Sequence, residues 1–295
     1  MSRATATAPA AISVVNAIIT GHAGASLAID WQTRATVTLA EDSPGVAVEI
    51  QGAPAPREHE PLARLVHQHI AHALGAPDVG AHIATSGEVP MGRGIKSSSA
   101  AANAIALASN AAFQRFDGRA LPRDRLLELA VDAALEAGVT ITGAYDDASA
   151  TMTGGLCVTD NRARRLIQRT EPDEIDVVLV IPAEFRATLS VKDLPYAAFR
   201  PAAEHAHLMC RQGRWQDALT LNGLACAALY DAPATWTRDA LAAGCTAAGL
   251  SGKGPAFAAI GERDALVAFA DGLDLPGGTT IHLSRTTNAR AEVLS

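Results

Sequence analysis

Apolar residues recur along the chain with two periods, and these periods predict strands interleaved with helices. Apolar runs bounded by turn residues predict strands, which are expected at 12–19, 26–30, 36–39, 46–50, 81–86, 156–159, 176–181, 255–260 and 279–284. Apolar positions three and four residues apart predict helices, which are expected at 60–74, 97–116, 123–136, 201–213, 214–230, 236–248 and 263–271. Because strands and helices alternate in both halves, we expect a mixed α/β or α+β chain.

A charged segment near the middle of the chain, Asn161–Asp173, predicts a boundary between two domains. The length of 295 residues also suits two domains, at roughly 150 residues each. We expect an N-terminal domain at 1–165 and a C-terminal domain at 166–295.

The composition supports a folded chain with a core rather than a disordered or nucleic-acid-binding one. Apolar residues make up 48% and charged residues 19%, which is enough to build a core. The net charge of −7 argues against nonspecific binding to nucleic acid or to anionic membranes. We find neither an apolar run long enough to span a bilayer nor a signal peptide. The four cysteines form no C-x-x-C pair, so we expect no zinc knuckle, no disulfide framework and a reduced, cytoplasmic location.

The most informative stretch runs from Gly87 to Ala101 and reads GEVPMGRGIKSSSAA; we call residues 87–99 the glycine–serine loop. A strand is expected before it and a long helix after it. Gly92 and Gly94 permit tight turns or close approach to a ligand. Three serines in the first turn of the helix add hydroxyl donors where free N–H groups and the positive end of the helix dipole favour an anion. This pattern predicts a phosphate site, and the alternative is an ordinary serine cap after a glycine turn.

Two details refine the prediction of a phosphate site. The loop is neither a Walker A motif, because Gly92 is followed by Arg93, nor a dinucleotide fingerprint, because the third glycine would fall on Ser97. Only three of the 24 basic residues are lysines, and two of these, Lys96 and Lys253, lie in glycine-rich loops. A lysine retained in such a chain indicates a need for a compact, movable ammonium group.

A second segment, residues 138–147 or the aspartate loop, ends in Asp146 and Asp147. Adjacent carboxylates in a loop rich in glycine and threonine suit metal binding or general-base chemistry. The alternative is a solvated turn or an aspartate that caps a following helix. The third glycine loop, residues 251–254, reads SGKG; it permits close backbone approach, and its alternative is a helix C-cap followed by a tight turn.

The glycine–serine loop resembles the phosphate loop P-x-G-x-G-[LI]-x-S-S-[SA]-A of the GHMP kinase superfamily, and its wording around Lys96 is similar to that of the archaeal-type shikimate kinases. Two spacings agree with the superfamily. Asp147 stands seven residues before Gly154, and Glu136 stands eleven residues before Asp147. The order and separation of the three loops also agree, so that the resemblance extends from about residue 8 to residue 260. The N-terminal motif, residues 8–17, carries no lysine, which several members have and the archaeal shikimate kinases lack.

The resemblance implies a two-domain GHMP-kinase-like α+β fold, with an N-terminal ribosomal-protein-S5-like domain and a C-terminal ferredoxin-like domain. It implies ATP as the phosphoryl donor, Mg²⁺ bound by Ser98 and Glu136, and Asp147 and Lys96 as catalytic residues. On a helical wheel Glu136 lies opposite the apolar stripe of its helix, so its metal role follows from the resemblance alone. The residues expected to bind the nucleotide are Pro90, Gly92, Arg93, Gly94, Ile95, Lys96, Ser97, Ser98, Ser99, Ala100, Ser251, Gly252, Lys253 and Gly254.

The resemblance also implies shikimate, or a similar hydroxy acid, as the acceptor of the phosphoryl group. The candidate partners of its hydroxyl groups are Asn16, His22, Thr142, Asp146 and Asp147. Two alternatives stay open: a sister kinase acting on homoserine, another amino alcohol or a cyclitol acid, and a nucleotide-binding regulator without catalysis. We expect a monomer or a homodimer, and we interpret His67, His69 and His72 as surface residues rather than a metal cluster.

Overall fold

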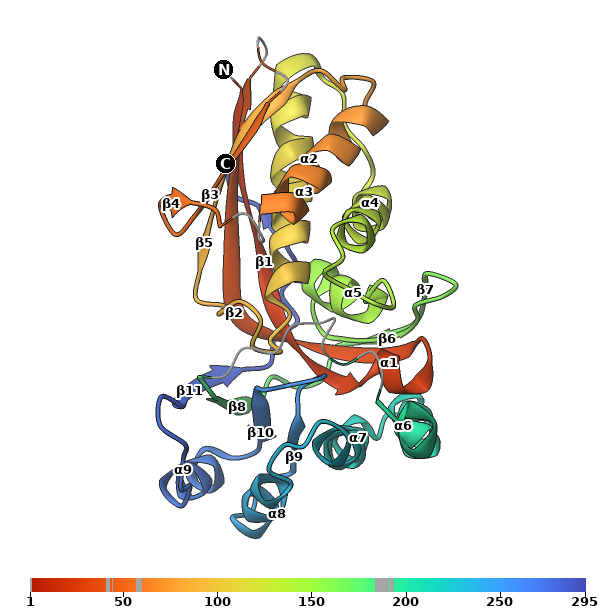
Figure 1. Ribbon diagram of the computed structural model, residues 1–295, viewed down its shortest axis with the longest axis vertical. Coiled ribbons are helices and arrows are strands. Elements are labelled where there is room, and N and C mark those ends of the chain that lie inside the picture. The colour runs from red at the N-terminus through yellow and green to blue at the C-terminus, as the bar shows by residue number, and fades with distance from the viewer. Residues whose placement is uncertain (1, 41–42, 44, 57–59, 184–190, 192–193) are drawn as a thin grey trace.

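The computed structural model describes residues 2–40, 43, 45–56, 60–183, 191 and 194–295. Its described part contains a larger, eight-stranded sheet and a smaller, four-stranded sheet (Figure 1). The larger sheet has the order β12-β1-β2-β5-β3-β4, with β6 paired to β2 and β7 paired to β6. Its strands are β1 (Arg3–Val15), β2 (Ala23–Ala40), β3 (Val46–Ile50), β4 (Ala53–Pro54), β5 (Gly80–Gly87), β6 (Leu156–Asp160), β7 (Arg165–Thr170) and β12 (Glu292–Val293).

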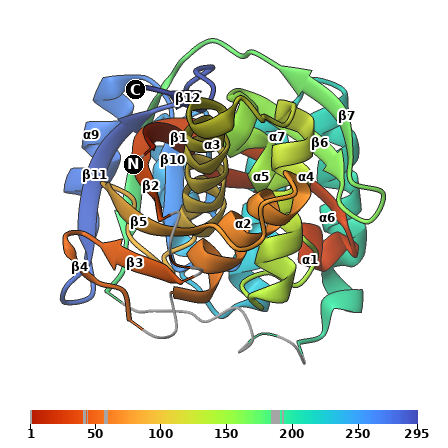
Figure 2. The same cartoon turned by 90° about the horizontal axis from the view of Figure 1, so that it is seen from above.

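Helices cover one face of the larger sheet (Figure 1). They are α2 (Glu60–Ala73), α3 (Ser97–Asp117), α4 (Arg123–Glu136) and α5 (Tyr145–Thr153), and a short helix, α1 (Ala17–Thr20), joins β1 to β2. Viewed from above, α3 lies at the centre, between the sheet and α4 (Figure 2). Its sequence suits that place because Ala100, Ala104, Ala108 and Ala112 recur every four residues, are fully or almost fully buried, and let the helix pack closely on the strands.

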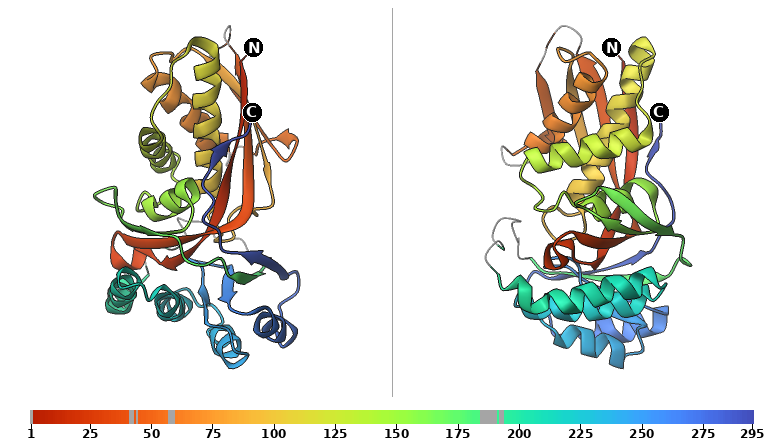
Figure 3. Two further views of the ribbon diagram at one scale, coloured as in Figure 1. Left: turned by 180° about the vertical axis from the view of Figure 1, so that it is seen from behind. Right: turned by 90° about the vertical axis from the view of Figure 1, so that its right-hand side faces the viewer.

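The smaller sheet is antiparallel and has the order β11-β8-β10-β9. Its strands are β8 (Asp176–Ile181), β9 (Ala247–Leu250), β10 (Phe257–Ile260) and β11 (Thr280–Arg285). The helices of this half are α6 (Tyr196–Arg211), α7 (Trp215–Leu229), α8 (Thr235–Ala242) and α9 (Arg263–Asp271). The C-terminal strand β12 returns to pair with β1, so that both termini lie at the same end of the molecule (Figure 3).

Two faces of the small sheet contribute to different cores. One face packs with α6, α7, the C-terminal half of β1 and the N-terminal half of β2. In this core Ile12 and Leu27 pack with Leu179 and Ala258. The other face packs on α8 and α9 around Phe257. The two halves of the chain are therefore joined by a continuous apolar layer, and the segments that carry the three loops lie beside this junction.

The expected mixed α/β fold is confirmed, and the elements predicted at 46–50, 123–136, 176–181 and 263–271 have the bounds predicted for them. The strand predicted at 12–19 is wrong in its second half, because the Asn16 side chain accepts the N–H of Ile18 at 2.9 Å and starts α1. The strands predicted at 26–30 and 36–39 are parts of one long strand, β2. The helix predicted at 236–248 ends early, since Gly244 adopts a φ of 96° and the alanine-rich run after it enters β9.

The segment predicted to separate two domains contains a strand that the apolar pattern missed, β7. This charged strand pairs only with β6 in the described part of the chain, and its residues are exposed or half-buried, as is typical of an edge strand. The division at residues 165 and 166 falls inside β7 and stays a prediction. None of the helices in the described ranges is long and apolar enough to cross a membrane.

Candidate active site

A pocket of about 570 Å³ lies where the three loops converge. One end is polar and is lined by the first turn of α3, the aspartate loop and the third glycine loop. The other end is apolar and is formed largely by Val48, Ile50, Leu62, Val131 and Val139. A volume of this size suits a ligand of several hundred daltons, and the two ends suit a ligand with one charged and one apolar part.

The glycine–serine loop turns sharply into α3. Gly92 and Gly94 adopt φ values of 67° and 88°, which favour glycine. A Cβ on Gly94 would also lie only 2.9 Å from the carbonyl oxygen of Ser251, so the loop needs glycine to approach the third glycine loop. Lys96, with a φ of 56°, stands at the N-cap position of α3 without a side-chain cap, and Ser97, Ser98 and Ser99 line the pocket. The alternative interpretation, in which a serine side chain caps α3, is therefore wrong.

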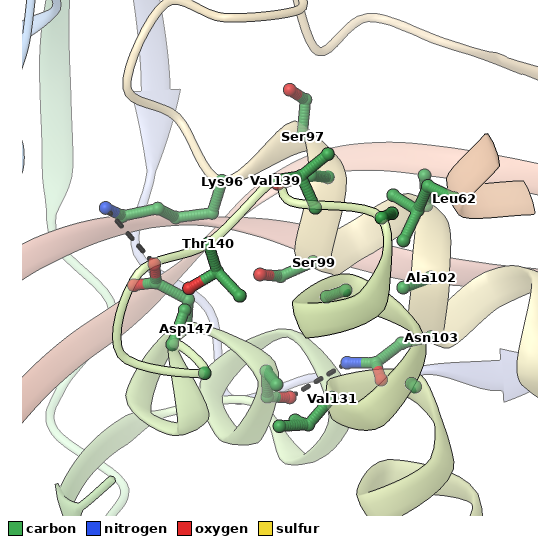
Figure 4. Close-up of a pocket in the computed structure, with 18 of the residues that line it drawn as sticks. Leu62, Lys96, Ser97, Ser99, Ala102, Asn103, Val131, Val139, Thr140 and Asp147 are labelled. Carbon is green, nitrogen blue, oxygen red and sulfur yellow. Dashed lines mark hydrogen bonds and ion pairs between the residues drawn. The ribbon is translucent and has the colours of Figure 1, made fainter. Parts of the chain in front are cut away.

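Lys96 and Asp147 point toward one another across the polar end (Figure 4). The Nζ of Lys96 lies 3.4 Å from the Oδ2 of Asp147, and the two side chains are 12% and 14% exposed. Asp147 belongs to the first turn of α5, where a carboxylate is favoured by the helix dipole. The two residues predicted to be catalytic are thus neighbours, although α3 and α4 separate them in the sequence.

Asp146 lies behind Asp147 and is only 3% exposed. Its Oδ1 accepts a hydrogen bond of 2.7 Å from the Nδ2 of Asn161. Burial, and then the negative charge of Asp147, raise the pKa of Asp146 to about 7. The buried hydroxyl of Ser26 lies between the two carboxylates, 2.5 Å from the Oδ1 of Asp147 and 3.3 Å from the Oδ2 of Asp146.

Ser251 joins the third glycine loop to both halves of the polar end. Its hydroxyl accepts the N–H of Ser13 at 3.0 Å and donates to the carbonyl of Gly94 at 2.7 Å. The N–H of Ala256 donates to the carbonyl of Arg93 at 2.9 Å. Since Ser251 is almost completely buried, this side chain fixes the spacing between β1, the glycine–serine loop and the third glycine loop.

The structure brings most of the predicted site residues to one pocket. Those that line it are Asn16, Gly92, Gly94, Lys96, Ser97, Ser98, Ser99, Thr142, Asp146, Asp147, Gly252 and Lys253. Those that do not line it are His22, Pro90, Arg93, Ile95, Ala100, Glu136, Ser251 and Gly254. Several of the second group support the first, because Ile95 and Ala100 are core residues under the loop.

Glu136 lies apart from the other predicted residues. Its side chain is 57% exposed, and its Oε2 lies 2.8 Å from the Nε2 of His69. The interpretation of His67 as a surface residue is wrong: it is fully buried, and its ring contacts the Ser109 hydroxyl and the Val79 carbonyl. Within the described ranges, no group of three or more His, Cys, Asp or Glu side chains could hold a metal ion.

Asn16 is engaged within the protein as well as lining the pocket. Its Nδ2 donates to the hydroxyl of Tyr230 at 3.2 Å, while its backbone N–H donates to the Oδ1 of Asn222 at 3.0 Å. Asn16 therefore ties the end of β1 to α7. His22 has a φ of 117° and a buried Nδ1 that finds no hydrogen-bond partner in the described part of the chain.

Sequence reasoning missed several residues in or next to the pocket. Ser26 of β2 is fully buried and does not line the pocket itself, and only its contact with α5 reveals its role. Leu62 and Val131 lie in the helices predicted at 60–74 and 123–136, and the structure adds that they line the apolar end of the pocket. Thr140 lies in the aspartate loop and faces the pocket (Figure 4). The signal in the sequence that could have pointed to these residues is that they lie in or near a motif. The sequence alone does not show whether an apolar residue faces the core or the pocket.

Comparisons with known proteins agree with this geometry. The family described as GHMP kinases N terminal domain matches residues 61–155. The shikimate kinase of Methanothermobacter thermautotrophicus is 39% identical over 263 residues, which cover 88% of each chain. The shikimate kinase of Pyrococcus furiosus is 36% identical over 255 residues, which cover 86% of this chain and 89% of its own. Homoserine kinase from Cytophaga hutchinsonii is similar in structure, with a TM-score of 0.77 at 18% identity over 100% of this chain and 98% of that one, which supports the fold.

Proposed function

Because this chain belongs to the GHMP kinase superfamily, in the group of the archaeal shikimate kinases, we propose that it is an ATP-dependent shikimate kinase. The reaction transfers the γ-phosphoryl group of ATP to the 3-hydroxyl of shikimate. The observation that carries the proposal is the approach of Lys96 to Asp147, at 3.4 Å, beside the serine-rich start of α3. The segment proposed to bind phosphate and the carboxylate proposed to accept a proton therefore line the same pocket.

The two ends of the pocket suit the two parts of ATP. The uncapped N–H groups at the start of α3 and the hydroxyls of Ser97, Ser98 and Ser99 would hold the phosphates. The apolar end, with Leu62 and Val131, would take the base by burying its flat faces. Gly252 and Lys253 would meet the phosphates from the opposite side.

Asp147 would accept the proton of the attacking hydroxyl or orient that hydroxyl toward the γ-phosphorus. Lys96 would place positive charge beside the transferring group, where negative charge has to be balanced. Several superfamily members have a lysine in the N-terminal motif that could supply this charge, and residues 8–17 of this chain contain none. Asn16, His22, Thr142 and Asp146 remain the candidates for binding the acceptor, and three of these four line the pocket.

The superfamily's use of ATP also raises the question of Mg²⁺. In phosphoryl-transfer sites this ion keeps several waters and is bound through substrate phosphates and one or two protein oxygens. The polar end fits an ion that arrives with ATP, because Ser98 offers a hydroxyl there and no ready carboxylate cage is found among the described residues. When bound, the ion would neutralise phosphate charge. To bind such an ion, the side chain of Glu136 would have to break its contact with His69.

The role of Glu136 can be tested by the Mg²⁺ dependence of the rate. In Glu136→Gln we expect the Mg²⁺ concentration at half-maximal rate to rise by about tenfold or more, because even the loss of a residue that only supports a metal ligand typically costs about 10–100-fold in metal affinity. His69→Gln, which removes only the partner on the surface, is the control and should not raise it. An unchanged Mg²⁺ dependence in Glu136→Gln would show that Glu136 is a surface residue and not a ligand.

The assay that tests the function measures ADP released from ATP with shikimate, homoserine, other amino alcohols and cyclitol acids as acceptors. We expect ADP release to depend on shikimate and to fall by roughly 10²–10⁴-fold in Asp147→Asn. Asp173→Asn, which changes an exposed aspartate, is the matched control and should keep the wild-type rate. Release that depends on another acceptor would identify a sister kinase, and binding of ATP without turnover would identify a regulator.

A further inference from the structure

A second carboxylate, Asp146, lies directly behind Asp147 and has a place built for it. It is almost completely buried, and it sits over Gly24 of β2. A Cβ at Gly24 would lie 2.5 Å from the Cγ of Asp146, so glycine is what leaves room for this side chain. A buried carboxylate that a neighbouring residue accommodates so closely needs an explanation, because burial of an unpaired charge is costly.

The hydrogen bonds around Asp146 fix the role of one of its oxygens. The Oδ1 of Asn161 accepts the hydroxyl of Thr159 at 2.7 Å and the backbone N–H of Asp146 at 3.1 Å. The Nδ2 of Asn161 must therefore face the Oδ1 of Asp146, which it reaches at 2.7 Å. Asp146 Oδ1 is an acceptor, and only Oδ2 is left to face Ser26.

Counting hydrogens at Ser26 decides what Oδ2 can do. A serine hydroxyl carries one hydrogen, and the shorter contact, 2.5 Å to the Oδ1 of Asp147, takes it. Asp147 is also the carboxylate that faces Lys96, so it is the one that carries the negative charge. The remaining contact, 3.3 Å from Ser26 Oγ to Asp146 Oδ2, is attractive only if Asp146 brings its own proton.

The charged and titratable groups around Asp146 agree with a protonated side chain. The negative charge of Asp147 favours the neutral form, whereas the ammonium of Lys96 and the amide of Asn161 favour the charged form. Beneath it on β6 lies the thiol of Cys157, whose own pKa burial raises to about 11, so that it stays neutral. Burial is the largest influence and raises the pKa of Asp146 to about 7.

We propose that Asp146 is a neutral hydrogen-bond donor, and that the chain Asp146 to Ser26 to Asp147 makes Asp146 and Ser26 positioning residues for the carboxylate of Asp147. The proposal rests on the proposed function for its meaning in catalysis. The chain holds Asp147 Oδ1 from behind and directs Oδ2 toward Lys96 and the pocket. In this role Asp146 is neutral and positions Asp147, whereas the alternative role is an ionised Asp146 that binds the acceptor.

Asp146→Asn separates this role from those of an ionised Asp146. The amide has the shape of a neutral carboxyl group, its Oδ1 can still accept from Asn161, and its Nδ2 can donate to Ser26. We expect the kcat of Asp146→Asn to exceed that of Asp147→Asn by about tenfold or more, because the donor to Ser26 is kept, and Ser26→Ala to lower kcat by about tenfold or more with little change in the KM for ATP. An Asp146→Asn variant that folds normally but is as inactive as Asp147→Asn would overturn the proposal, as would a Ser26→Ala variant with wild-type kcat.

The pH profile gives a readout that a purely structural role would not move. As the pH rises through about 7, wild-type Asp146 loses its proton and the chain breaks, so kcat should fall. Asn cannot titrate, and the variant should lack this fall. An identical fall in both proteins would assign it to another group and count against the proposal.

Infrared spectroscopy tests the network without any turnover. At about pH 6, wild type should show the carbonyl band of a protonated carboxylic acid, and this band should be missing in Asp146→Asn. A missing band in wild type would refute a neutral Asp146 whatever the enzyme phosphorylates. Failure of shikimate to support ADP release, with the band present, would instead refute the proposed function and leave the network intact.

Discussion

Replacement of Gly24 by alanine should separate catalysis from nucleotide binding. The new Cβ would lie 2.5 Å from the Cγ and 2.6 Å from the Oδ2 of Asp146. Carbon atoms that are not bonded pack at about 3.5–4.0 Å, so Asp146 has to retreat by about 1 Å. The neighbouring atoms leave little space for this movement, because Asp146 is held by Asn161 and packed beneath Ser26.

The size of the expected loss in kcat depends on which residues this displacement moves. A shift of about 1 Å at a reacting group costs about 10²-fold in rate, and overpacking a core costs about 1–3 kcal/mol of stability. The displacement passes through Ser26 to Asp147, whereas the glycine–serine loop is held from the other side by Ser251. We therefore expect kcat to fall by about 10²-fold, while the KM for ATP stays nearly unchanged.

The assay is steady-state ADP release under saturating acceptor, together with thermal unfolding. Gly277→Ala is the matched control, because a Cβ there meets nothing within 4 Å and its φ is not one that disfavours a side chain. A Gly24→Ala protein with wild-type kcat would refute the reasoning, since it would mean that Asp146 can move without disturbing Asp147. A loss of ATP affinity equal to the loss of kcat would also refute it.

Two further perturbations address the joint between the loops and the buried carboxylate. Ser251→Ala would leave the buried N–H of Ser13 without a partner, at a cost of about 1–3 kcal/mol, and would free the half-buried carbonyl of Gly94, so the unfolding temperature should fall and the KM for ATP should rise; an unchanged KM would mean that the loop keeps its shape without Ser251. The second perturbation, Asp146→Asn, removes a titrating group, so the free energy of unfolding of wild type and variant should differ in its pH dependence. The native pKa of about 7 lies above the unfolded value near 3.8, so wild type binds a proton more tightly when folded and loses stability as the pH rises through this window. Relative to wild type, the variant should gain stability between about pH 4 and pH 8 in urea unfolding, and a constant difference would show that Asp146 titrates normally.

The local chemistry of this protein could be predicted from its sequence because that chemistry is carried by short segments. Glycines next to Lys96 and three serines encode a turn into a helix whose first N–H groups are free, and this depends on neighbours within about ten residues. The bounds of α4, β8 and α9 were likewise set by strong periodicity and turn residues. The superfamily and its donor could be inferred from the order and spacing of such segments.

Short apolar and charged runs were harder to interpret because a capping side chain or a pairing strand, and not their own period, decides which element they form. Residues 17–19 continue an apolar run, yet the side chain of Asn16 turns them into α1. The charged strand β7 forms because it pairs with β6 across the short turn between Asp160 and Arg165, and its charged residues obscure the apolar pattern that would predict a strand. Neither result is encoded in the period of the residues themselves.

The site depended on the tertiary structure wherever contacts cross between elements. Only the packing of α5 against β2 places Ser26 between two aspartates, and a lone serine in a buried strand gives no sign of it. The same packing removes Asp146 from water and so changes which carboxylate carries the charge. The sequence by itself therefore determined which groups are available, whereas distance and burial, which arise only when remote segments meet, decided what state each group is in and which neighbour it serves.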